Sequence, residues 1–66
     1  MTLSEAKRLA ENKLRTTGKS HAIFLDEVFG DHRVYEVGTM NEQMARDTAN
    51  VELVEIVNAV QEDLGL

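Results

Sequence analysis

The chain has 66 residues, of which 42% are hydrophobic and 29% charged, and its formal net charge is −5 at pH 7. A chain of this length buries only about 60% of the surface that it exposes when unfolded, so residues 1–66 have room for a single domain with one small core. Cysteine and proline are both absent, which excludes disulfide scaffolds and zinc sites built on thiolates.

The first twenty residues predict a helix over residues 3 to 17. Thr2 and Glu5 have the spacing of a capping box, in which the threonine hydroxyl accepts from the Glu5 backbone and the glutamate carboxylate accepts from the Thr2 backbone. Gly18 supplies the left-handed residue that commonly follows the end of a helix. Apolar residues recur at the three- and four-residue spacing of one helix face: Leu3, Ala6, Leu9, Ala10 and Leu14.

Residues 20 to 37 change to a period of two and are richer in β-branched and aromatic residues, which predicts a β-hairpin. Gly30 followed by Asp31 fits a two-residue turn, and that register sets Val28 opposite Arg33. Both faces of this hairpin are partly apolar, and a two-stranded sheet needs covering layers. We therefore expect the chain's own helices on one face and a second subunit on the other, in a homodimer. The residues predicted for dimerisation are Ile23, Leu25, Phe29 and Val34.

The capping-box spacing recurs at Thr39 and Glu42, so a second helix is expected to begin at Met40. Residues 51–57 also alternate as a strand would, but the apolar period continues past the length of a strand, which favours helix. We expect helical structure over residues 40–64, as one helix or two. Its apolar stripe consists of Leu53, Val54, Val57, Val60 and Leu64. The predicted fold is a small α+β domain of order α-β-β-α, with both helices on one face of an antiparallel hairpin.

No set of residues has the spacing of a catalytic, cofactor-binding or metal site. His21 and His32 lie at opposite ends of the hairpin and lack a third ligand. Ser20, His32 and Asp31 lack the strained elbow and the oxyanion hole of a hydrolase. No apolar run approaches the ~18 residues of a membrane span. We expect a soluble, cytoplasmic, non-enzymatic protein without a cofactor or metal.

The charge is distributed unevenly along the chain. Residues 1–20 carry +3, whereas the chain from His21 onward carries −8, which favours a partner with a positively charged surface. The basic residues of the first helix do not share one face, which argues against direct binding of nucleic acid. The residues predicted to contact a basic protein partner are Glu42, Asp47, Glu52, Glu55, Glu62 and Asp63.

The succession LSEAKRLAENKLRTTGK, then SHAIFLDEVFGDHRVYEV, then an acidic segment, resembles small phage-encoded proteins that inhibit host machinery. Some of this loose class resemble DNA electrostatically and block nucleoid or transcription proteins. The resemblance implies a DNA-mimic inhibitor that serves host takeover by occupying a basic, nucleic-acid-binding surface, although the basic first helix departs from a uniformly acidic mimic. Two alternatives stay open: a structural or assembly protein that oligomerises through the hairpin, and a nucleic-acid binder that uses the first helix.

Overall fold

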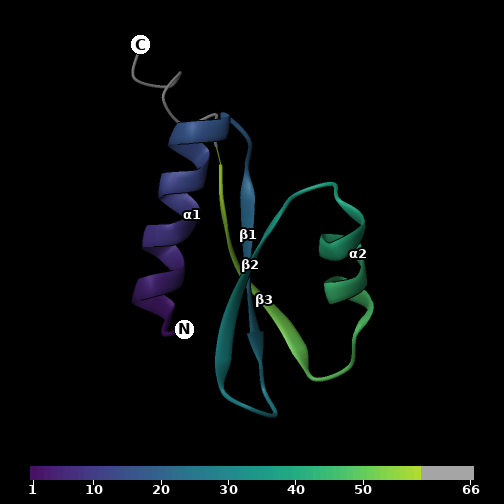
Figure 1. Cartoon of the computed structure of the whole chain (residues 1–66). Coiled ribbons are helices and arrows are strands. Elements are labelled where there is room, and N and C mark those ends of the chain that lie inside the picture. Colours follow the sequence, from purple (N-terminus) through teal and green to yellow (C-terminus); the bar gives the residue numbers. More distant parts are fainter. Residues whose placement is uncertain (59–66) are drawn as a thin grey trace.

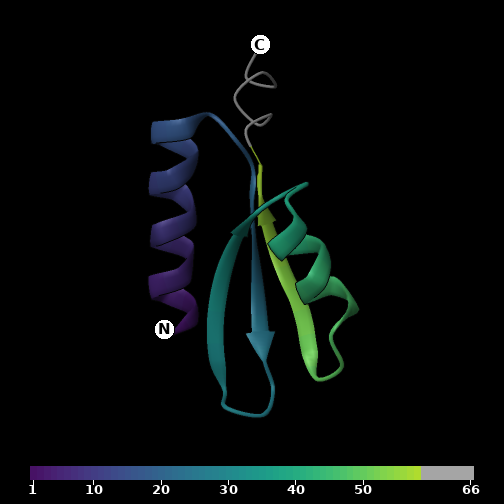
Figure 2. The ribbon, with the colours of Figure 1, turned by 45° about the vertical axis from the view of Figure 1, so that its right-hand side comes forward.

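The computed structural model describes residues 1–58, which form two helices and one antiparallel sheet (Figure 1). The α+β class predicted from the sequence is confirmed. The elements in chain order are α1 (Leu3–Thr17), β1 (His21–Asp26), β2 (Asp31–Glu36), α2 (Met40–Asp47) and β3 (Val51–Val57). The spatial order of the strands is β2-β1-β3, so β1 is the central strand, as Figure 2 shows.

Helix α1 has the predicted bounds and both bonds of the predicted capping box. The Thr2 N–H donates to the Glu5 carboxylate at 2.8 Å, and the Glu5 N–H donates to the Thr2 hydroxyl at 3.1 Å. Gly18 follows the last turn with a φ of 74°, a conformation that costs glycine nothing. The helix buries Ala6 and Ala10 against the sheet, and their small side chains let the helix backbone approach it closely.

The two helices lie on opposite sides of the sheet, so the prediction that both pack on one face is wrong (Figure 1). Side chains of β1 alternate between these sides. Ile23 packs against α1 in the core, whereas Phe24 faces the space beneath α2. His21, Ala22, Ile23 and Phe24 are consequently all buried. The apolar character of both hairpin faces is thus explained within one chain, and Ile23 is covered by α1 rather than available to a second subunit.

The hairpin has the predicted faces but not the predicted register. A four-residue turn, 27–30, replaces the two-residue turn, and Arg33 lies opposite Phe24 rather than Val28. The turn is closed by Asp26, whose carbonyl accepts from the Gly30 N–H at 2.7 Å and whose carboxylate accepts from the Val28 N–H at 3.0 Å. Because the shift amounts to an even number of residues, the side chains that remain in β1 and β2 keep their predicted faces, whereas residues 27–30 lie in the turn.

Residues 51–57 form β3, so the prediction of a helix there is wrong. They pair with the edge of β1 that β2 leaves open, and their valines and isoleucine favour extended backbone. Asn50 takes a φ of 65°, which asparagine tolerates, just before the strand begins. The apolar residues that extended the helical period, Val60 and Leu64, lie outside the described residues.

The burial of Ile23 predicts its contribution to stability. Replacing Ile23 by alanine removes a fully buried side chain between α1 and β1, and should lower the free energy of unfolding by about 2–5 kcal/mol. Replacing the exposed Val28 by alanine should change it by less than about 0.5 kcal/mol. Urea denaturation measures both. Similar costs for the two variants would contradict the assignment of the core.

Candidate functional site

Helix α2 contributes no fully buried apolar side chain, and hydrogen bonds with neighbouring residues fix its first turn. Its only buried residue is Glu42, which is 3% exposed. The Glu42 carboxylate accepts from the Gly38 N–H at 3.1 Å and from the Nε of Arg46. Thr39 caps the helix, accepting from the Glu42 N–H at 3.3 Å and donating to the Glu36 carbonyl at 2.7 Å. The predicted cap at Thr39 is confirmed, but the Glu42 carboxylate binds Gly38 instead of the Thr39 backbone.

A cleft of about 280 Å³ lies between α2 and the sheet. Its apolar lining comes from Phe24, Tyr35, Met44, Ala45 and Val51, and its polar lining from Asp26, Arg33, Asn41 and Thr48. The rings of Phe24 and Tyr35 pack at a centroid distance of 5.8 Å and are tilted by 54°. Since Phe24 belongs to the buried central strand, this aromatic pair gives the cleft a fixed floor.

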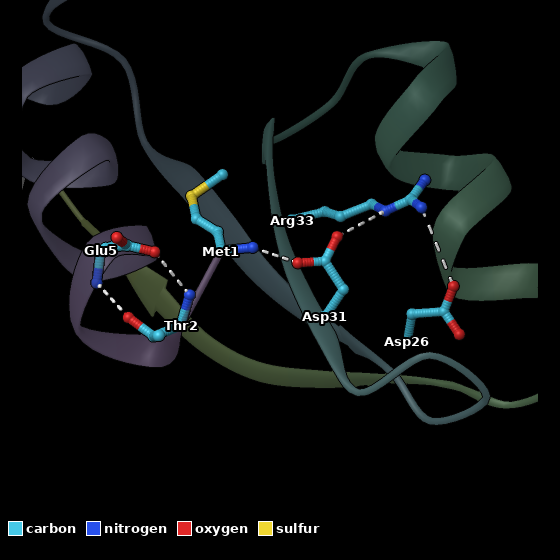
Figure 3. A network of polar contacts seen from close by, with 6 residues as sticks. All are labelled: Met1, Thr2, Glu5, Asp26, Asp31 and Arg33. Carbon is cyan, nitrogen blue, oxygen red and sulfur yellow. Dashed lines mark hydrogen bonds and ion pairs between the residues drawn. The ribbon is translucent and has the colours of Figure 1, made fainter.

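Charged groups at the cleft form the network drawn in Figure 3. The Arg33 guanidinium lies 3.9 Å from the Asp26 carboxylate and 3.8 Å from the Asp31 carboxylate, and Asp31 also pairs with the amino group of Met1. The hydrogen bond from that amino group holds the pKa of Asp31 below its usual value. Hydrogen bonding with Tyr35, helped by the two carboxylates, raises the pKa of Arg33. Of these groups, Asp26 and Arg33 line the cleft and give it one carboxylate and one guanidinium.

The residues predicted to bind a basic partner do not form one face within the described residues. Glu42 is buried beneath α2, and Glu55 pairs with Lys7 of α1 at 3.4 Å. Glu52 lies on the α1 side of β3, opposite Leu25, whereas Asp47 ends α2 on the other side of the sheet. The prediction assumed a helix over 51–57; in the strand, Glu52 and Glu55 share the α1 side, away from Asp47. The remaining two, Glu62 and Asp63, lie outside the described residues.

The residues predicted for dimerisation do not form one free surface either. Ile23 is fully buried, and Leu25 and Val34 are partly buried on the same side of the sheet. Only Phe29, in the turn between β1 and β2, is largely exposed, at 79%. The structure therefore assigns most of this predicted set to the chain's own core layer.

Sequence reasoning missed the cleft because its position depends on which side of the sheet α2 covers. One signal was available: Met40 and Met44 are one helical turn apart, and methionines at that spacing are common on adaptable binding surfaces. Both are exposed, at 75% and 60%, and Met44 borders the cleft. Nothing in the local sequence placed Tyr35 or Ala45 beside them.

The search for other kinds of site gives two further results. Within residues 1–58, no three side chains that could ligate a metal lie together. No helix in this part of the chain is long and apolar enough to cross a membrane.

Comparison with known proteins finds no matching family model, no similar curated protein and no similar solved structure. The function of the cleft is therefore inferred from the chain's own residues.

The bonds of Glu42 predict a pH dependence of stability. Arg46, and next the Gly38 N–H, hold the pKa of Glu42 below its usual value of 4.5. Because the folded state binds this proton less readily than the unfolded state, ionised Glu42 stabilises the fold above pH 4.5, and this stabilisation is lost as the pH falls through the lower folded pKa.

Glu42→Gln should therefore lower stability at neutral pH and flatten its decline toward about pH 3. Urea midpoints measured across this range test the prediction, with Glu52→Gln as the control for an exposed carboxylate on β3. A Glu42→Gln variant that declines as steeply as the wild type would show that these bonds do not anchor α2.

Proposed function

We propose that the protein is a non-enzymatic, acidic protein-binding module whose cleft beneath α2 receives one large apolar side chain of a basic partner protein. The cleft itself carries this proposal. Cavities that bind whole small molecules measure about 300–1,000 Å³, and this one is slightly smaller, at about 280 Å³. Its size and its aromatic floor suit a single inserted side chain, with phenylalanine as the best match because the Phe24 and Tyr35 rings offer it tilted packing.

The charge around the cleft supports a basic partner. Arg33 and the Met1 amino group balance Asp26 and Asp31, and Asp47 adds a carboxylate at the end of α2. The whole chain carries −5, so its long-range field also attracts positive charge. Electrostatics of this kind speed association and select against acidic partners, while the apolar contact supplies most of the affinity.

The weak apolar attachment of α2 supports insertion of a side chain beneath it. The helix buries no apolar residue, so a small displacement of α2 costs little burial of apolar surface. Met44 borders the cleft, and its unbranched thioether side chain can adapt to an inserted ring. The helix remains tied at its first turn by Thr39 and Glu42, which would act as the fixed end of that movement.

The narrower hypothesis of a DNA mimic stays a prediction from resemblance. It needs rows of exposed carboxylates, and the described residues place Glu42 in a buried position and Glu55 in an ion pair. Binding of an apolar side chain in the cleft does not require such rows of carboxylates. A cytoplasmic location remains part of the proposal, supported by a sequence without cysteine.

Titration with short peptides, followed by two-dimensional NMR of the backbone amides, tests the proposal. The probe is acetyl-Lys-Lys-Phe-Lys-Lys-amide, and the controls replace phenylalanine by alanine or all four lysines by glutamate. We expect the phenylalanine peptide to shift the amide signals of Phe24, Tyr35 and Ala45, and both controls to bind at least about tenfold more weakly. An equal response to the alanine peptide, or no response at the cleft, would overturn the proposal.

Two methionines of α2 provide a matched pair of variants. Met44→Ser removes a wall of the cleft, whereas Met40→Ser changes a more exposed residue of the same helix that does not line it. We expect Met44→Ser to weaken binding of the phenylalanine peptide several-fold and Met40→Ser to leave it unchanged. Equal effects would place the contact on the outer surface of α2 instead of in the cleft.

A further inference from the structure

We propose that a second copy of this chain pairs with the outer edge of β3, which joins the two sheets into one continuous antiparallel sheet. In the spatial order β2-β1-β3, which covers residues 1–58, β3 has a neighbouring strand on one side only (Figure 2). An edge strand presents a row of backbone N–H and C=O groups that can pair with another strand. Of β3, only Val51 lines the cleft, and the inference does not depend on the proposed function.

The two edges of the sheet differ in how they are protected. β2 has charged side chains at Asp31, Arg33 and Glu36, and these form ion pairs with other parts of the chain. Charged residues of this kind discourage pairing at an edge. β3 also carries Glu52 and Glu55, but it exposes three apolar side chains along its middle: Leu53 at 38%, Val54 at 40% and Ile56 at 39%. The open edge with apolar surface to bury is therefore β3.

The pairing of β3 with β1 fixes the side on which each β3 residue lies. Leu53 is opposite Phe24 and Ile56 is opposite Ala22, so both lie on the α2 side. The register shifts between these two pairs, with Val54 as the extra residue. Because of that shift, the α1 side receives Glu52, Glu55 and Val57, which lie opposite Leu25, Ile23 and His21.

In a symmetric antiparallel pair of β3 strands, residues that lie on the same side of the sheet must be opposite one another. Two registers meet this condition along most of β3. One register sets Val51 opposite Ile56 of the second copy and Glu52 opposite Glu55, and like charges in direct opposition are destabilising. The other sets Leu53 opposite Ile56 and Glu52 opposite Val57. It brings no two carboxylates into opposition, and the two-fold axis repeats each favourable pair.

The second register therefore makes β3 complementary to a second copy of itself. It buries the two half-exposed apolar residues of the α2 side, Leu53 and Ile56, against their counterparts. It also leaves Glu55 free to keep its ion pair with Lys7 of its own chain. The homodimer expected from the sequence is thus assigned to the β3 edge instead of to a face of the hairpin.

Sedimentation equilibrium of the full chain at micromolar concentration tests whether two copies associate through the β3 edge. Leu53→Lys places a charge on β3, and the matched control, Val37→Lys, adds the same charge after β2 at a residue of almost equal exposure, 37% against 38%. We expect the wild type and Val37→Lys to be dimers and Leu53→Lys to dissociate about tenfold more readily or more. A monomeric wild type, or equal weakening by both substitutions, would overturn the proposal.

Disulfide cross-linking tests the register. Directly opposed residues fall within the Cα separation of about 4.4–6.8 Å that a disulfide spans, whereas Leu53 and its own counterpart do not face each other. Under oxidation, Leu53→Cys mixed with Ile56→Cys should yield a cross-linked dimer, and either variant alone should not. Cross-linking of Val51→Cys with Ile56→Cys in preference, or of no mixture, would contradict the proposed pairing.

Discussion

The burial of β1 on every side is the constraint on which the rest of the structure depends. A chain of 66 residues has few side chains with which to build a core, and it concentrates them around one strand. β2 and β3 pair with the two edges of β1. Helix α1 packs on one face of the sheet against Ile23, and α2 lies over the other face, above Phe24. β2, β3 and α1 are therefore positioned by their contacts with one central strand, whereas α2 mainly contacts β2 and β3.

The two faces of β1 are covered in different ways, and this difference creates the candidate site. On one face, alanines of α1 meet Ile23 directly, with no polar group between them. On the other, α2 is short and contributes no buried apolar side chain, so it leaves a cleft above the Phe24 and Tyr35 rings. One face thus stabilises the domain, while the other keeps apolar surface accessible at the cost of weaker packing.

Sequence reasoning succeeded where local interactions decide the structure and failed where distant segments do. The capping box at Thr2 and Glu5, with the helical spacing that follows it, defined α1 correctly. The run 51–57 was ambiguous by itself, and only the open edge of β1 decides that it forms a strand. The position of the cleft could not be predicted, because it depends on the side of the sheet that α2 covers and on the register that brings Arg33 opposite Phe24.

Amide hydrogen exchange measures the central claim most directly, because it reports the opening free energy of each element separately. The amides of β1 should exchange most slowly, at the rate set by global unfolding, since strands cover both edges of β1 and helices lie over both faces. Amides of α2 should exchange much faster through local opening, since that short helix contributes no fully buried apolar side chain. Protection of α2 equal to that of β1 would contradict the account, because the cleft would then lie under an element as firmly packed as the core.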